Sequence, residues 1–140
     1  MTIEYGKPLP QAQKWSKTFW EGTKEKKLLL KKCKTCGNID FPPYLYCTEC
    51  MSTEYEWIES SQKGTVYSFS TTYVGAPPAF AGEQPYTLVF VDLVEGVRVL
   101  SRMVNCDPLD VRIGMEVEAV FETATDDVTL VMFRPVNSNR

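Results

Sequence analysis

Two short stretches, Cys33-Lys-Thr-Cys36-Gly37 and Cys47-Thr-Glu-Cys50, decide how this chain is organised. In each stretch two residues separate a pair of thiols, and ten residues separate the two pairs. Thiolates at this spacing can face one ion when the backbone between them turns tightly, and Gly37 relieves the crowding in such a turn. Four sulfur ligands complete a tetrahedron around zinc and leave no position for water. The sequence therefore predicts one structural zinc ion.

The spacing alone leaves other uses of these cysteines open. A tetrahedron of four thiolates also accepts iron, as in a rubredoxin-type centre. Redox-active or disulfide-forming pairs are a further alternative. The ten-residue gap is shorter than the commonest two-pair zinc pattern, and Met51 stands where the second turn is expected to carry glycine. Cys106 has no partner at motif spacing, and we interpret it as an inert core or turn residue.

Length and composition indicate one modest globular domain with a small satellite. The chain has 140 residues, of which 44% are hydrophobic and 24% charged. No hydrophobic run reaches the roughly 20 residues that a membrane-spanning helix needs. Residues 1–10 show neither a basic leader nor an apolar signal region. We therefore expect a cytoplasmic protein with reduced cysteines and no membrane association.

Charge and residue types argue against catalysis and against nucleic acid. Residues 1–59 carry nine lysines and eight acids, whereas residues 60–140 carry six basic residues and ten acids. The larger part is therefore acidic, at −4, and would repel a phosphate backbone. Histidine, the commonest general base, is absent, and no serine or cysteine has an identifiable base. We expect a protein that is not an enzyme, although it can be an accessory subunit of one.

The second part of the chain reads as a β-barrel. It contains five runs of alternating or apolar residues, at 65–74, 86–94, 97–104, 115–121 and 128–133. Five strands with a break between the third and the fourth suit a small Greek-key barrel of the OB type. A five-stranded SH3-like barrel has the same number of strands and stays open. Glu95-Gly96 predicts a two-residue hairpin turn between the second and third strands.

The fold class is therefore mainly β, in three segments. We expect a helical arm at 1–27, a rubredoxin-like zinc ribbon at 28–59 and an OB-fold domain at 60–140. The arm should form one or two short amphipathic helices between residues 8 and 27, with Glu21-Gly22 as a stop signal. Its aromatic residues either cover the edge of the following domain or line a ligand or partner site; they are Trp15, Phe19 and Trp20.

Two further features are candidates for ligand contact. Six lysines lie between Lys24 and Lys34, and within this cluster Lys31 and Lys32 could receive the phosphates of a cofactor. The long Pro-rich connection at 75–85 carries Phe80, which we expect to be exposed at its tip. The corresponding loop of OB barrels often contacts the ligand, while a rigid spacer packed on its own barrel is the alternative.

Taken together, these features resemble a family of small prokaryotic proteins that join a rubredoxin-like zinc ribbon to a C-terminal OB-fold and are associated with acyl-CoA metabolism. The resemblance covers nearly the whole chain and rests on the aromatic arm, Cys33-Lys-Thr-Cys-Gly37, Phe41-Pro42-Pro43, Cys47-Thr-Glu-Cys50, Trp57, Gly64-Thr-Val-Tyr-Ser-Phe69, Gly96 and Gly114. It departs from the family at Gln62, where a glycine is frequent, and this concerns only the geometry of a turn.

The resemblance implies a function that composition does not show. It implies that the four cysteines bind zinc and that the protein is a non-catalytic acyl-CoA-binding or scaffold protein. It also implies a partner, either a thiolase or another acyl-CoA enzyme. The alternative is a single-stranded nucleic-acid-binding protein built from a zinc ribbon and an OB-fold, because both modules commonly serve that purpose. An electron carrier with iron at the four cysteines is a third hypothesis.

Overall fold

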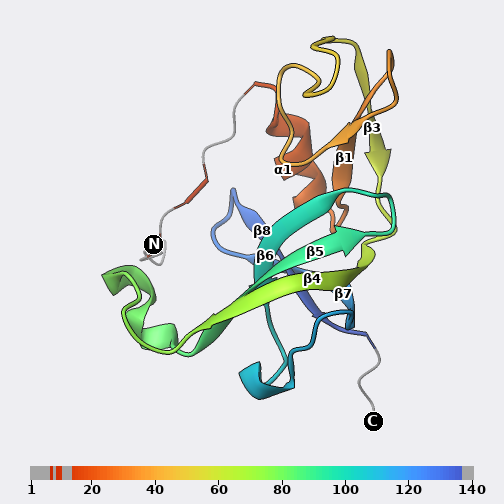
Figure 1. The fold of residues 1–140 in the computed structure, drawn as a ribbon. Coiled ribbons are helices and arrows are strands. Elements are labelled where there is room, and N and C mark those ends of the chain that lie inside the picture. Colours follow the sequence, from red (N-terminus) through yellow and green to blue (C-terminus); the bar gives the residue numbers. More distant parts are fainter. Residues whose placement is uncertain (1–6, 8, 11–13, 137–140) are drawn as a thin grey trace.

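A computed structural model describes residues 7, 9–10 and 14–136 of the chain, which form one helix, a small sheet and a closed barrel (Figure 1). The helix α1 spans Lys17–Lys24. The small sheet contains β1 (Leu29–Cys33), β2 (Ile39–Asp40) and β3 (Tyr55–Glu59). The barrel contains β4 (Lys63–Thr72), β5 (Tyr86–Leu93), β6 (Arg98–Met103), β7 (Glu116–Thr123) and β8 (Thr129–Pro135). Within this described part, no helix has the length and hydrophobicity needed to cross a bilayer.

The small sheet has β1 in its centre, with β2 and β3 antiparallel on either side. Lys31 of β1 lies opposite Asp40 on one side and Trp57 on the other. This sheet alone is too small to bury an adequate core. The two cysteine pairs lie at one end of it, and the barrel lies at the other end (Figure 1).

The barrel closes in the strand order β4-β5-β6-β8-β7, with β7 pairing back to β4. All neighbours are antiparallel except β6 and β8. This Greek-key order in five strands confirms the predicted OB-fold. Gly64 lies at the closure, where a Cβ atom would sit 2.4 Å from the carbonyl oxygen of Asp92. A larger residue therefore does not fit between β4 and β5 at this point.

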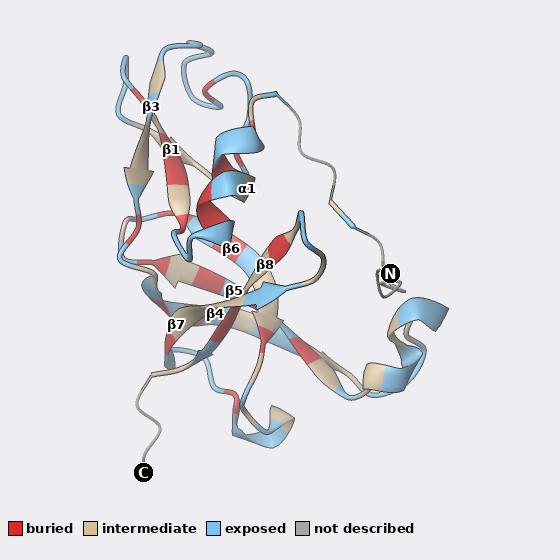
Figure 2. Ribbon diagram, turned by 180° about the vertical axis from the view of Figure 1, so that it is seen from behind, coloured by how far each residue is buried: buried red, intermediate tan, exposed pale blue. Residues whose placement is uncertain are grey.

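One hydrophobic core joins the helix and the small sheet to the barrel. The barrel contributes Val66, Val89, Val91, Val99, Val117 and Phe133. Phe19 of α1 and Leu28 and Leu30 around β1 belong to the same cluster, and Phe19 is only 4% exposed. Figure 2 shows buried residues running from the barrel strands into α1 and β1. The helix therefore covers the barrel rather than standing apart as an arm.

The helix differs from its predicted extent and its predicted stop. It occupies Lys17–Lys24, within the predicted range 8–27, of which residues 8 and 11–13 lie outside the described part. Gly22 is buried inside the helix instead of ending it. A Cβ atom on Gly22 would lie 2.8 Å from Leu29 Cδ1, so glycine permits a close approach of the helix to β1. Packing therefore overrides the local stop signal.

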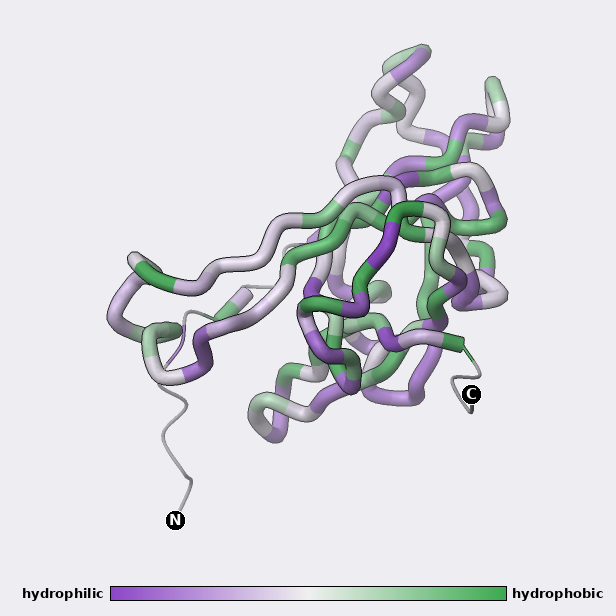
Figure 3. The backbone as a smooth tube through the Cα atoms, turned by 60° about the horizontal axis from the view of Figure 1, so that its bottom comes forward, coloured by the Kyte–Doolittle hydropathy of each residue, from purple (hydrophilic) through white to green (hydrophobic). Residues whose placement is uncertain are grey.

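In the connection between β5 and β6, three residues (94–96) separate the hydrogen-bonded residues Leu93 and Val97, so the prediction of a two-residue turn is wrong. The amide of Gly96 donates to the oxygen of Leu93 at 2.8 Å, and the amide of Leu93 donates to the oxygen of Val97 at 2.9 Å. Gly96 has a φ of 93°, as expected for the last residue of a three-residue hairpin loop. By contrast, β4 and β5 extend beyond the barrel as a projecting hairpin (Figures 1 and 3).

Candidate functional site

The four cysteines of the two pairs converge on one point. The sulfur atoms of Cys33 and Cys50 are 3.6 Å apart, as are those of Cys36 and Cys47, and all four sulfurs lie within 4.8 Å of one another. A tetrahedron of Zn–S bonds of about 2.3 Å has edges of roughly 3.8 Å. Disulfide sulfurs would be about 2.05 Å apart. The donor set and its geometry therefore suit one tetrahedral metal ion.

The two turns that carry these sulfurs have the same backbone structure. The amide of Gly37 donates to the oxygen of Cys33 at 3.0 Å, and the amide of Met51 donates to the oxygen of Cys47 at 2.9 Å. Gly37 has a φ of 82° and Met51 a φ of 66°, so both residues have the left-handed backbone conformation. The second turn therefore adopts the glycine-type conformation with a methionine, at a cost in strain.

Backbone amides prepare two of the thiols for metal binding. The amides of Thr35 and Cys36 donate to Cys33 Sγ at 3.3 and 3.4 Å. These bonds, that of Cys36 above all, lower the pKa of Cys33 to about 6. Amides of the second turn lower the pKa of Cys47 in the same way. An amide also lowers the pKa of Cys50, but desolvation and neighbouring thiols outweigh it and raise that pKa. The four cysteines would hold a divalent cation as thiolates, so the remaining protons would be lost when it binds.

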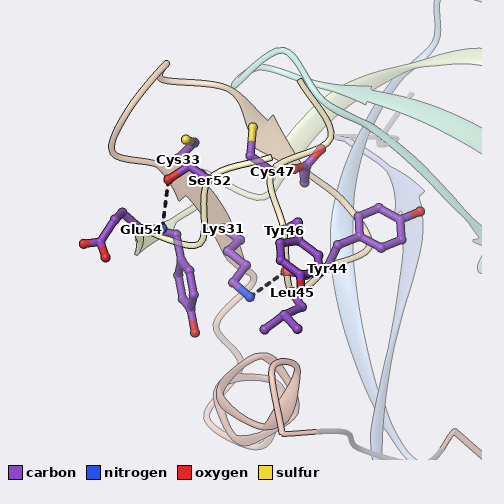
Figure 4. A pocket seen from close by; sticks show the side chains of 10 residues that line it. Lys31, Cys33, Tyr44, Leu45, Tyr46, Cys47, Ser52 and Glu54 are labelled. Carbon is purple, nitrogen blue, oxygen red and sulfur yellow. Dashed lines mark hydrogen bonds between the residues drawn. The ribbon is translucent and has the colours of Figure 1, made fainter. Parts of the chain in front are cut away.

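Lys31 lies in β1, two residues before the metal ligand Cys33, and contacts three parts of the chain. Its side chain is buried, and its ammonium donates to the oxygen of Tyr44 at 2.6 Å (Figure 4). The ammonium also donates to the oxygen of Trp15 at 3.4 Å. The same ammonium lies 3.7 Å from the ring centre of Tyr55, and burial lowers its pKa, partly offset by Asp40. Lys31 therefore connects the helix entry, the loop between the cysteine pairs and β3.

The structure does not bring the predicted lysine pair together on one surface. Lys31 faces inward and Lys32, its neighbour in β1, is half-buried on the opposite face. The cavity beside Lys31 has a volume of only about 10 Å³ (Figure 4). That volume holds about one water molecule and no phosphate group. The interpretation of Lys31 as a phosphate ligand therefore conflicts with its position, because its ammonium is already bound by two carbonyl groups.

The predicted aromatic residues of the arm meet in one cleft. The cleft has a volume of about 470 Å³ and is mainly apolar. It is lined by Trp15, Phe19 and Trp20 from the helix region, by Phe41, Pro42, Pro43 and Tyr44 from the loop between the cysteine pairs, and by Val99, Leu100 and Val131 from the barrel. Three segments far apart in the sequence therefore build it. Only the helix residues were identified from sequence, although Phe41-Pro-Pro is an apolar signal within a metal-binding loop.

Phe80 does not reach this cleft, and the expectation that it is exposed is wrong. It lies in the 3-10 helix η1 (Pro78–Glu83), is half-buried, and packs against Tyr86 with ring centres 6.0 Å apart. Glu83 fixes the same segment through ion pairs with Lys7 at 2.7 Å and Arg102 at 2.5 Å. The connection is therefore held against its own hairpin, as in the spacer interpretation.

The outer face of the barrel next to the cleft is apolar. Phe90 lies opposite Leu100 in the sheet, and Leu88 lies two residues before Phe90 on the same face. These three side chains are 41%, 56% and 40% exposed, respectively. Leu100 also lines the cleft, so the two apolar surfaces are continuous.

The barrel arginines are engaged at the protein's own surface. Three of them form ion pairs: Arg98 with Asp92, Arg102 with Glu83, and Arg134 with Glu118. Arg112 donates to the backbone oxygen of Leu109 at 3.0 Å. The nucleic-acid alternative needs positive charge that is available to a phosphate backbone, whereas these four arginines contact carboxylate and carbonyl groups of the chain itself.

Taken together, the four-cysteine site and the Greek-key barrel define a zinc-ribbon protein with an OB-fold. Comparisons identify the family more closely. Residues 20–56 match the family model of the ChsH2 rubredoxin-like zinc ribbon domain, and residues 57–122 match that of the ChsH2 C-terminal OB-fold domain.

Relatives carry names of scaffold proteins and enzyme subunits. A DUF35 domain-containing scaffold protein of Methanocaldococcus jannaschii is 42% identical over 110 residues, which cover 77% of each chain. A probable enoyl-CoA hydratase alpha subunit of Thermomonospora curvata is 31% identical over 92% of this chain but only 40% of its own length. The benzoylsuccinyl-CoA thiolase subunit BbsA of Thauera aromatica is 34% identical over 69% of this chain and 64% of its own.

A solved structure has the same fold. A chain of the Ltp2-ChsH2(DUF35) aldolase superposes with a TM-score of 0.80 at 31% identity, over 91% of this chain and 98% of that one. The chain therefore belongs to the DUF35 (ChsH2-type) family, in which a rubredoxin-like zinc ribbon precedes an OB-fold.

Proposed function

We propose that this protein is a non-catalytic subunit that partners a thiolase or a related acyl-CoA enzyme and binds the acyl part of a CoA thioester in its aromatic cleft. The ribbon holds one structural zinc ion through Cys33, Cys36, Cys47 and Cys50. We also propose a cytoplasmic location, because the four thiols must stay reduced to bind a metal.

The observation that carries this proposal is the cleft of about 470 Å³ between α1, the loop between the cysteine pairs and the barrel. Its volume lies within the range of small-molecule sites, and its lining is apolar and aromatic. Such a lining suits an acyl chain. The zinc ion supports the cleft indirectly, because the loop between the cysteine pairs forms one of its walls.

The apolar face beside the cleft supports the second part of the proposal, that a partner enzyme binds this protein. Leu88, Phe90 and Leu100 are exposed side by side on β5 and β6. Exposed apolar side chains that adjoin a ligand cleft are typical of protein interaction sites. A partner enzyme bound there would lie next to the acyl group. Relatives named as a thiolase subunit and as part of an aldolase are consistent with such an arrangement.

The two tryptophans of the cleft provide a direct binding assay. The zinc-loaded protein is titrated with octanoyl-CoA and with free CoA, and tryptophan fluorescence is measured. We expect octanoyl-CoA to change the fluorescence and to bind more tightly than CoA, because only the thioester has a chain that fills the cleft. Leu100→Asp should weaken binding about 5- to 30-fold, corresponding to roughly 1–2 kcal/mol of lost apolar contact and added charge.

A matched control separates the cleft from the rest of the surface. Tyr73 is 54% exposed and lies outside the cleft, so Tyr73→Ala should bind octanoyl-CoA like the parent protein. Equal binding by Leu100→Asp and the parent protein, with both folded, would exclude the cleft as the acyl site. Tight, steeply salt-dependent binding of single-stranded oligonucleotides would instead favour the nucleic-acid alternative.

A further inference from the structure

Strand β4 has one paired edge and one edge that is open over most of its length. It pairs with β5 from Gly64 to Thr72, but with β7 only from Lys63 to Thr65. The last bonds on the β7 side join Val66 to Met115 and Gly114. Beyond Val66, the described residues provide no strand on that side of 67–72. The backbone groups of this edge are therefore available to another strand.

The open edge lacks charge and proline, two devices that normally protect such strands, although a β-bulge lies at its start, between Val66 and Ser68. Its sequence is Tyr67-Ser-Phe-Ser-Thr-Thr72, which has neither proline nor charge. The uncharged stretch is longer still, since residues 65–82 contain no acidic or basic residue. Natural sheets usually guard an exposed edge with lysine, proline or a covering segment. Aromatic and hydroxyl side chains of this kind instead favour strand pairing.

Apolar side chains lie beside the open edge. Ile113 is 71% exposed, and the bond between Gly114 and Val66 places it next to the point where pairing with the barrel ends. Phe69 of the edge itself is 39% exposed. The hairpin formed by β4 and β5 projects away from the barrel (Figures 1 and 3).

We propose that the open edge of β4 at 67–72 pairs antiparallel with the same edge of a second copy of this chain. The charge distribution favours this occupant. The chain has a net charge of −3, and its residues 60–140 have −4, so two copies repel one another over most of the barrel. Residues 67–72 carry no charge themselves, and the Arg98 guanidinium, which lies 3.4 Å from the Tyr67 ring centre, is paired with Asp92. Antiparallel pairing of one strand with its twin also satisfies two-fold symmetry without any other complementary surface.

The pairing would produce one sheet continuing across two barrels. Each copy would bring its own Ile113 to the border of the shared sheet, where its side chain would lose contact with water. The cleft lined by Trp15, Trp20 and Leu100 does not include residues of the open edge. The proposal is therefore independent of acyl-CoA binding, and its failure would leave that function untouched.

Ser70 allows a charge test of this interface. It is exposed in the middle of the edge. In sedimentation experiments on the full zinc-loaded chain at about 5–300 µM, the mass should rise from 15.9 kDa toward twice that value. Ser70→Lys and Ser70→Glu should each weaken the dimer at least about ten-fold, because each copy then carries a like charge at the interface. An equimolar mixture of the two variants should form the dimer again.

Controls make every outcome decisive. Thr18→Lys adds the same charge on an exposed helix position and should leave the dimer intact. Unchanged circular dichroism of the Ser70 variants excludes misfolding. Hydrogen exchange at 67–72 should slow as protein concentration rises. A chain that stays monomeric at 300 µM, a dimer unaffected by Ser70→Lys, or protection of 67–72 that needs an added partner enzyme would each overturn the proposal.

Discussion

Met51 offers a test of the metal site that does not touch a ligand. It has a φ of 66° in the second cysteine turn, while Gly37 has a φ of 82° at the matching place in the first turn. A non-glycine residue in this conformation costs roughly 1–2 kcal/mol. Met51 is 67% exposed, so its removal loses little packing, roughly 0.5 kcal/mol. We expect Met51→Gly to stabilise the ribbon by about 1 kcal/mol.

Zinc affinity measures this gain, because folding of the ribbon and metal binding are coupled. A gain of about 1 kcal/mol corresponds to roughly five-fold tighter zinc binding in competition with a chromophoric chelator. Met51→Ala is the control, since it removes the thioether but keeps the Cβ atom and the strain; it should bind zinc slightly more weakly than the parent. If Met51→Gly binds zinc no more tightly than Met51→Ala, the assigned left-handed turn is incorrect.

Three further predictions concern the rest of the fold. Gly64→Ala should lower the free energy of unfolding by at least about 2 kcal/mol, because its Cβ would lie 2.4 Å from a carbonyl oxygen. The control Gly82→Ala, whose Cβ would have no atom within 4 Å, should leave thermal unfolding nearly unchanged. Lys31→Met should cost about 2 kcal/mol in denaturant unfolding and weaken octanoyl-CoA binding, since it removes charged hydrogen bonds that hold two walls of the cleft; unaltered stability and binding would contradict this role. Hydrogen bonds from Lys7 and Arg102 lower the pKa of Glu83 in the folded protein. The contribution of these ion pairs to folding stability should therefore be complete above the ordinary pKa of 4.5 and should be lost as the pH falls through the lower pKa of the folded state. An NMR titration that gives this carboxyl a pKa at or above 4.5 would refute the prediction.

The strands and the metal site were predictable because their signals are local. Alternation placed β4, β5 and β6 within two residues of their observed ends. The paired cysteines needed only their spacing. The fold class follows from these two signals, since five strands with one long break permit few closed topologies.

Features that depend on contacts across the chain were not predictable in the same way. Gly22 reads as a helix stop, but the approach of Leu29 makes it a packing residue inside the helix. Lys31 reads as part of a solvated lysine run, yet carbonyl groups of Trp15 and Tyr44 hold it inside the protein. The cleft itself needs Leu100 of the barrel next to the helix, and no periodicity reports that proximity.

Gln62 shows how the structure explains a departure from the family pattern. It has a φ of 71°, a left-handed conformation that favours glycine, which is the residue expected here from the family resemblance. Here the side chain compensates in part, because its amide donates to the oxygen of Lys26 at 2.9 Å. The turn geometry is therefore kept with a different residue.

The central claim is that Cys33, Cys36, Cys47 and Cys50 enclose one zinc ion that holds the ribbon and, through it, one wall of the cleft. X-ray absorption at the zinc edge of the purified protein tests this most directly. One zinc per chain with four sulfur neighbours at about 2.3 Å is the expected spectrum. A folded ribbon with no metal, or a zinc with fewer than four sulfur neighbours, would contradict the claim.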